Sequence, residues 1–275
     1  MNAVIRYSGT NPVRGLPEWY VATRQGINAG CSDSSKITMR SSSVSPSQKY
    51  RLITSYYEQH DLEKRYSCGT LYDDSGGIIA SINRDDDNFW NAWISIGDKQ
   101  EYLLCGESAV SQTVIDCTSR ECFLHIDTTP RQTIYWHSVH PNPCDPTILA
   151  VEGKYSNSAW RIAFFKFITP EHPFVLIGVI QDWYSEFKGW YSSDTVLIAR
   201  DYEVRRSDGK LIEALSEAEQ QELHTRRSTW MGMKPEDSKV LFPNREDLLI
   251  YLDTDTRQDF EYWNVPRKLG ISITS

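Results

Sequence analysis

Short apolar runs alternate with polar turn residues between residues 44 and 212. The runs are rich in Tyr, Val, Ile, Leu, Phe and Trp, and Gly, Asn, Asp, Ser or Pro interrupts them every 8 to 12 residues. Runs of β-branched and aromatic residues bounded by turn residues are typical of β-strands. The pattern therefore predicts a mainly β protein whose strands are joined by short turns.

This strand pattern repeats in four units. The second apolar run of each unit contains a leucine, and the four leucines lie 45 to 52 residues apart: Leu52, Leu104, Leu149 and Leu197. A unit of that length holds about four short strands, as a β-propeller blade does, and must stack on its neighbours to bury both faces. We therefore expect four propeller-like antiparallel β-units in a small, incomplete or decorated propeller. A β-sandwich with evenly spaced hairpins is the alternative.

The segment before these units has a different pattern. Residues 1–43 are rich in Ser, Gly, Asn and Thr, without regular apolar periodicity. Such composition favours an irregular arm, with the aromatic pair Trp19 and Tyr20 docking on the body of the protein. The repeated β-units are then expected over residues 44–215.

The segment after the units, residues 216–275, is expected to be a helical and extended addition packed on the same domain. Ser216 and Glu219 have the spacing of a capping box, which predicts a helix to about Arg227. Asn244 is expected to cap a second short helix with a leucine-rich apolar face.

Composition excludes several classes of function. The net charge of -8 argues against a general nucleic-acid surface, which needs clustered Lys and Arg, and it disfavours an anionic membrane. No apolar stretch approaches the roughly 18 residues of a membrane helix, and the first residues lack a signal-peptide core. We expect a cytoplasmic protein without a nucleic-acid partner, a membrane partner or a cofactor.

The cysteines support the same compartment. There are six, none of them in a C-x-x-C spacing: Cys31, Cys68, Cys105, Cys117, Cys122 and Cys144. They are few for the length of the chain, which also lacks an Asn-x-Ser/Thr sequon. We expect reduced thiols rather than a disulfide framework.

Several phrases of the repeated region resemble a family of uncharacterised bacterial proteins with β-propeller-like repeats. They are SPSQKYRL, FWNAWI, EYLLCGES followed by QTVID, HPNP followed by ILAVEGKY, and EVRRSDGK. The resemblance covers about residues 44 to 212 and implies the repeated β fold, but no activity. In that family a stretch rich in Cys and Trp more often follows the ILAVEG phrase, where this chain reads KYSNSAW.

Acidic residues follow the second apolar runs of three units: Glu107, Glu152 and Asp201. If the units stack, equivalent positions converge on one rim, where carboxylates can share a proton or bind a hard cation. Together with His140 they are the candidate catalytic residues of a hydrolase. The structural alternative is that each acid faces solvent or hydrogen-bonds a neighbouring unit.

A metal site is weighed at His137 and His140, with Cys144 and Asp145 close behind. The surrounding residues indicate a strand, and residues three apart on a strand point to opposite faces. We therefore predict no metal here, and expect a histidine that packs against tryptophan.

The run Asp85, Asp86 and Asp87 is expected to be a solvated connector, because adjacent carboxylates repel one another. It is also the candidate binding site for a basic partner protein.

Tryptophans recur near the starts of the units, and four are candidate binding residues: Trp90, Trp93, Trp136 and Trp190. Exposed rings would form a platform for a sugar or for an apolar patch of a partner, whereas buried rings would fill the core between units.

No G-x-S-x-G elbow, P-loop or G-x-G-x-x-G occurs. The leading hypothesis is thus a non-enzymatic binding or inhibitory module that recognises another protein, and the acidic net charge favours a basic partner. The alternatives are the hydrolase described above and, more weakly, a carbohydrate-binding module.

Overall fold

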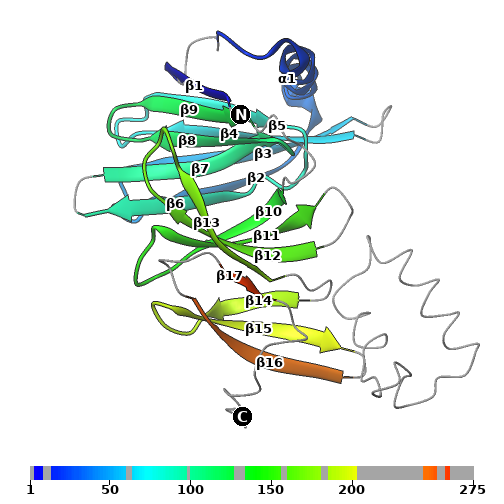
Figure 1. Cartoon of the computed structure of the whole chain (residues 1–275). Helices are drawn as coiled ribbons and strands as arrows, with labels where there is room; N and C mark the ends of the chain where they lie inside the picture. The colour runs from blue at the N-terminus through cyan, green and yellow to red at the C-terminus, as the bar shows by residue number, and fades with distance from the viewer. Residues whose placement is uncertain are drawn as a thin grey trace, which may run out of the picture.

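β-Sheets make up nearly all of the regular structure in the computed structural model (Figure 1). The structure describes residues 3–8, 14–59, 64–97, 100–126, 134–155, 160–180, 185–202, 244–252 and 258–260. Within these residues there is one α-helix, α1 (Glu18–Gly30), and one short 3-10 helix, η1 (Ser34–Lys36). The prediction of a mainly β protein is confirmed.

The described strands form four sheets, which we number in chain order. Sheet 1 has the order β2 (Ile37–Val44), β3 (Arg51–Gln59), β4 (Lys64–Tyr72) and β5 (Ile78–Arg84). Sheet 2 has the order β1 (Ala3–Ser8), β9 (Glu121–Ile126), β8 (Ser111–Asp116), β7 (Gln100–Ser108) and β6 (Asn91–Ile96). Sheet 3 has the order β10 (Ile134–Pro141), β11 (Ile148–Tyr155), β12 (Trp160–Phe167), β13 (Phe174–Ile180) and β17 (Gln258–Phe260). Sheet 4 has the order β14 (Ser185–Trp190), β15 (Thr195–Tyr202) and β16 (Asn244–Tyr251).

Each sheet is built from consecutive antiparallel strands, to which β1 and β17 are added from near the two ends of the chain. The four leucines aligned in the sequence lie on β3, β7, β11 and β15, which are the second strands of the consecutive sets. The described strands define four open sheets and no closed ring. Four sheets also differ from the two layers of the β-sandwich alternative.

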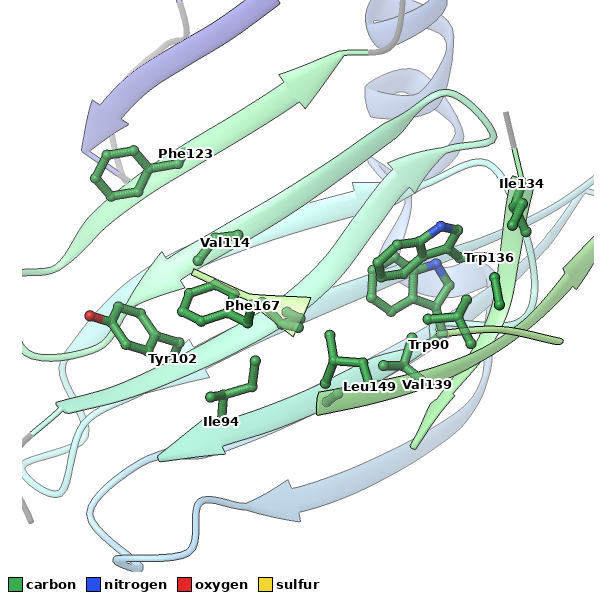
Figure 2. Packing of buried hydrophobic residues seen from close by; sticks show 14 of the residues in the cluster. Trp90, Ile94, Tyr102, Val114, Phe123, Ile134, Trp136, Val139, Leu149 and Phe167 are labelled. Atoms are coloured by element: carbon green, nitrogen blue, oxygen red, sulfur yellow. The ribbon is translucent and has the colours of Figure 1, made fainter. Parts of the chain in front are cut away.

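The sheets stack face to face, with an apolar cluster between each neighbouring pair. Sheets 1 and 2 enclose one cluster, which includes Leu52, Leu71 and Ile115. Sheets 2 and 3 enclose the largest, where the rings of Trp90 and Trp136 lie 5.2 Å apart (Figure 2). The third cluster joins sheets 3 and 4. Burial between layers is therefore what holds the sheets together.

Strand β7 shows how this stacking appears in the sequence. All its residues after Gln100 are buried, because sheet 2 lies between two other sheets. Leu103 belongs to the cluster with sheet 1, whereas Leu104 belongs to the cluster with sheet 3. A strand covered on both faces reads as a continuous apolar run, and this accounts for YLLC at residues 102–105.

The expected irregular arm over residues 1–43 is wrong for its described part, which contains β1, α1, η1 and β2. Helix α1 buries Tyr20, Ile27 and Gly30, positions that share one helical face. A Cβ at Gly30 would lie 2.6 Å from the ring of Tyr66, so this glycine allows α1 to approach β4. Tyr20 docks on the body as expected, whereas Trp19 is exposed.

The helix expected to begin at Asn244 is also wrong, because residues 244–251 form β16. This strand pairs with β15 along its whole length, from Tyr202 with Asn244 to Thr195 with Tyr251. Ile250 is buried and Tyr251 is exposed, the alternation of a strand. The helix expected from Ser216 to Arg227 lies outside the described residues.

Candidate functional site

The first acid of the repeated phrase, Glu107, ends up on β7 beneath α1. Its side chain is 2% exposed. An Arg24 Nη2 atom of α1 lies 3.0 Å from Glu107 Oε1, and the Tyr20 hydroxyl donates to Oε2 over 3.2 Å. Tyr20 also shares a 2.7 Å hydrogen bond with Ser111 on β8. We call Tyr20, Arg24, Glu107, Ser108 and Ser111 the Glu107 cluster.

The environment of Glu107 disfavours its charge. Burial raises the pKa of this carboxyl to about 7, although Arg24 and the Tyr20 hydroxyl both favour the ionised form. The nearby Asp85 adds to the rise. Glu107 therefore titrates near neutral pH, as a general acid or base does, but from a position enclosed by α1 and sheet 2.

The second acid, Glu152 on β11, has a more accessible and more polar environment. Its Oε2 accepts a 2.6 Å hydrogen bond from Ser138 Oγ and lies 2.9 Å from His140 Nε2. Its Oε1 accepts from the backbone amide of Phe187 over 3.1 Å. The His140 ring stacks on the Phe187 ring with centroids 4.6 Å apart. We call Ser138, His140, Glu152 and Phe187 the Glu152 cluster.

Hydrogen bonding decides the ionisation of Glu152. Burial would raise its pKa, but the bonds from His140, Ser138 and the Phe187 amide outweigh burial and hold the pKa below its usual value. Glu152 is thus a stable carboxylate beside a histidine that is 36% exposed. Such a pair can hold a proton or bind a polar group at the surface.

The Glu152 cluster contains Ser, His and an acid, but not in the arrangement of a catalytic triad. In a triad one histidine nitrogen faces the serine and the other faces the acid. Here His140 Nε2 faces both Ser138, at 3.2 Å, and Glu152. Ser138 donates its proton to Glu152, so the histidine does not activate it as a nucleophile.

Of the four candidate catalytic residues, the structure brings His140 and Glu152 together. Glu107 has a separate set of partners on sheet 2 and α1. The backbone of Asp201 pairs with Arg245 between β15 and β16, and its side chain lies outside the described part.

The acidic run connects β5 to β6, as its sequence predicted, but only Asp87 is exposed, whereas Asp85 and Asp86 are half-buried. Asp86 accepts hydrogen bonds from the Tyr135 hydroxyl and the Asn88 amide, and these lower its pKa against the effect of burial. Asp85 is half-buried, and its burial raises its pKa. Asp87 forms a surface ion pair with Arg65. Repulsion between these neighbouring acids is reduced because hydrogen bonds stabilise the charge of Asp86, an ion pair neutralises that of Asp87, and burial disfavours that of Asp85.

Arg84, directly before this run, is a site that the sequence did not reveal. Its side chain is 1% exposed and donates to backbone carbonyls of Asn88, Gly106 and Trp136. Because Gly106 is on β7 and Trp136 on β10, a single guanidinium connects sheets 1, 2 and 3. We interpret Arg84 as structural, since a buried cation without these acceptors would be costly.

The tryptophan platform is also corrected by the structure. Trp90 and Trp136 are buried in the core between sheets 2 and 3. Trp93 and Trp190 are half-buried, and their indole N–H groups donate to Ser43 Oγ and to the His140 carbonyl. The four rings therefore join neighbouring sheets rather than form an exposed platform.

Among the described residues, no three His, Cys, Asp or Glu side chains gather closely enough to hold a metal ion. His137 is exposed, and its carbonyl accepts a 2.6 Å hydrogen bond from Asn88. All six cysteines are free thiols.

The outer face of sheet 1 is a surface that no other described sheet covers. Register places three rows of residues on it: Val44, Arg51, Tyr72 and Ile78; Ser42, Ile53, Thr70 and Ser81; Arg40, Ser55, Cys68 and Asn83. All twelve are exposed or half-buried, because α1 covers only the end of the sheet near Tyr66, where its Asn28 accepts a hydrogen bond from Asn83. We call these twelve residues the open face.

The open face mixes apolar groups with hydroxyls and carries two arginines but no carboxylate. Neither Arg40 nor Arg51 has an ion-pair partner within the part of the chain that the structure describes. Beside it, the turns β2–β3 and β4–β5 border a surface groove of about 500 Å³. Lys49, Asp73 and Asp74 line this groove together with Arg51.

Comparison with known proteins adds little to this geometry. No protein-family model matches the chain. Over 128 residues the chain is 30% identical to the uncharacterized protein R762 of Acanthamoeba polyphaga mimivirus. The matched stretch covers 46% of this chain and 50% of that protein, so the chain spans about half the length of this relative. In the part that the structure describes, no helix has both the length and the apolar character needed to cross a membrane.

Proposed function

We propose that this protein is a non-enzymatic binding module of the cytoplasm, built from four propeller-like β-units, that recognises another protein. The open face of sheet 1 carries the proposal. Sheets 2 and 3 are covered on both sides by neighbouring sheets, whereas sheet 1 ends the stack with one face uncovered. An extended surface that mixes apolar and polar groups is typical of interfaces between separately folded proteins.

The propeller-like arrangement is supported by the stacking of four consecutive antiparallel sets and by the resemblance to the bacterial repeat family. Free thiols at all six cysteines suit a reducing compartment.

The partner that we propose differs in charge from the basic partner favoured by the sequence. The net charge of -8 would suit a basic protein, but Asp86 and Asp87 have intramolecular partners and Asp85 is half-buried. The uncovered surface instead presents Arg40 and Arg51. Charge complementarity at this face therefore favours an acidic partner.

The test is affinity capture with the purified chain, followed by reconstitution of the complex with the purified partner. Ile53→Glu places a charge at the centre of the open face and is expected to abolish the complex. Val175→Glu, at an exposed position of β13, is the matched control and is expected to retain it. Equal binding by both variants, with unchanged thermal unfolding, would show that the open face is not the interface.

The Glu152 cluster favours hydrolysis as a second candidate function, because a partly exposed histidine contacts a carboxylate. Purified protein would be assayed on activated esters and glycosides, with His140→Gln and Glu152→Gln as variants. Loss of an acid–base group is expected to lower the rate by about 100-fold or more. Absence of turnover, or equal rates in the variants, would reject hydrolysis at this cluster. The carbohydrate-binding alternative loses its main support because Trp90 and Trp136 are buried.

A further inference from the structure

Strand β2 forms one edge of sheet 1. It pairs with β3 from Ile37–Tyr57 to Val44–Arg51, and no other described strand pairs with its second edge. Five consecutive side chains, from Thr38 to Ser42, are exposed. An edge strand of this kind presents unpaired amide and carbonyl groups to any extended chain that approaches it.

The sequence of β2 lacks most of the features that protect edges. Natural edges are usually short, or contain Pro, inward charges or bulges that prevent pairing. Strand β2 is eight residues long, contains no Pro, and has an irregularity only near its start, between Ile37 and Met39. Its one charged residue is Arg40.

The edge strands of the next two sheets differ from β2. Strands β6 and β10 also begin their sheets, but they contact each other, and the majority of their residues are buried or half-buried. Among these three edges, β2 is therefore the one open to a partner.

Charge restricts the chemistry of an added strand. A strand paired with β2 would place alternate side chains on the open face, next to Arg40, while Arg51 lies one strand further in, on β3. These two guanidinium groups have no carboxylate in the three rows of the open face. An acidic residue of the partner would supply the missing opposite charge.

We propose that an extended acidic segment of the partner protein pairs with β2 as an additional strand of sheet 1. This inference rests on the proposed function and names its mode of recognition. Main-chain hydrogen bonds along β2 provide the affinity, and Arg40 selects for acidic side chains. The partner's remaining surface then lies over the open face.

The experiment uses the full chain and two synthetic peptides of about eight residues, the length of β2. Both alternate Thr and Val, one with Glu and the other with Lys at the positions beside Arg40. Hydrogen–deuterium exchange is expected to show protection of residues 37–44 by the Glu peptide. The Lys peptide is expected to bind roughly tenfold more weakly.

Two sets of variants test the edge itself. Arg40→Glu is expected to reverse the preference between the peptides, whereas Lys166→Glu on β12 makes the same charge change elsewhere and should not. Ser41 and Ser42 are adjacent, so in an antiparallel pair one of their amides bonds β3 and the other points away. Proline at the outward amide keeps sheet 1 folded but removes a donor to the added strand. Whichever of Ser41→Pro and Ser42→Pro retains the wild-type unfolding temperature is expected to lose the peptide.

Each contrary result has a clear meaning. Binding without protection of β2, or binding that the tolerated proline variant retains, overturns strand addition. A dimer of the free protein that this proline variant abolishes would show that a second copy, not an acidic partner, occupies the edge. The natural partner could bind the proline variant but not Ile53→Glu. That result would support the open face as the interface and overturn the inference about β2.

Discussion

Glu107 and Glu152 occupy matching places in the sequence, each three residues after the aligned leucine on the second strand of its set, yet their surroundings have opposite effects. Burial beneath α1 raises the pKa of Glu107 to about 7. Hydrogen bonds from His140, Ser138 and a backbone amide overcome burial at Glu152 and lower its pKa. The comparison shows that the element covering a strand, rather than the strand's own sequence, decides how an acid on it behaves.

The two acids should therefore affect stability in opposite directions as the pH changes. The pKa of Glu107 is higher in the folded than in the unfolded protein, so its contribution is greatest at low pH and is lost as the pH rises towards 7. The pKa of Glu152 is lower in the folded protein, so its contribution is present at neutral pH and is lost in acid. The following changes test this contrast.

Replacement of Glu107 by Gln is expected to have the largest effect. Between about pH 4.5 and pH 8 the wild type should lose about 3 kcal/mol of unfolding free energy through Glu107, and the variant should not. Urea unfolding of both proteins across this range measures the difference. A difference between them that stays constant with pH would mean that Glu107 keeps its usual pKa.

Replacement of Glu152 by Ala is expected to cost about 2 kcal/mol at pH 7. The side chain accepts three hydrogen bonds, and its removal leaves the amide of Phe187 and the hydroxyl of Ser138 without their acceptor. This loss of unfolding free energy should diminish as the pH falls below the usual pKa of a glutamic acid. Chemical unfolding at pH 7 and pH 4 tests both statements, and a larger loss at pH 4 would contradict them.

Replacement of Arg24 by Met is expected to cost about 1 kcal/mol at pH 8, where Glu107 is ionised, and less at pH 5, where it is neutral. Removal of the cation should also raise the pKa of Glu107 further, because Arg24 lowers it in the wild type. In the double variant with Glu107→Gln, the pH dependence of the Arg24 effect should disappear. If it persists, Arg24 has another titrating partner.

Replacement of His140 by Gln is expected to have the smallest effect, under about 1 kcal/mol, because the ring is partly exposed. The pKa of Glu152 should rise, since the bond from His140 is one of the groups that lower it. Titration of the Glu152 carboxyl by nuclear magnetic resonance would detect this rise. An unchanged titration would show that Ser138 and the Phe187 amide suffice.

The strands that carry the four aligned leucines were predictable because their information is local. Leu52, Leu104, Leu149 and Leu197 lie on second strands of the four sheets, as the spacing of apolar runs indicated. The strand at residues 244–251 was not predictable in this way, because a short apolar run such as LLIYL suits a helix or a strand. Pairing with β15 decides between the two.

The Glu107 cluster and helix α1 depend on contacts distant in sequence. Only three residues of α1 are buried, which gives a weak apolar pattern. Arg24 and Glu107 are far apart along the chain, so no local motif connects them. The contact of His140 with Glu152 was easier to predict from the sequence, because β10 and β11 are consecutive strands that pair with each other. Their joint exposure, however, depends on how sheet 4 packs against them.

Strands β16 and β17 complete sheets 4 and 3, although they lie beyond residue 243. During synthesis β15 and β13 are therefore finished well before their last partners exist. At typical elongation rates the interval between residue 202 and residue 258 is roughly 3 to 11 s. A nascent chain that stalls in this interval would present the unpaired edges of β15 and β13 to chaperones or to other chains.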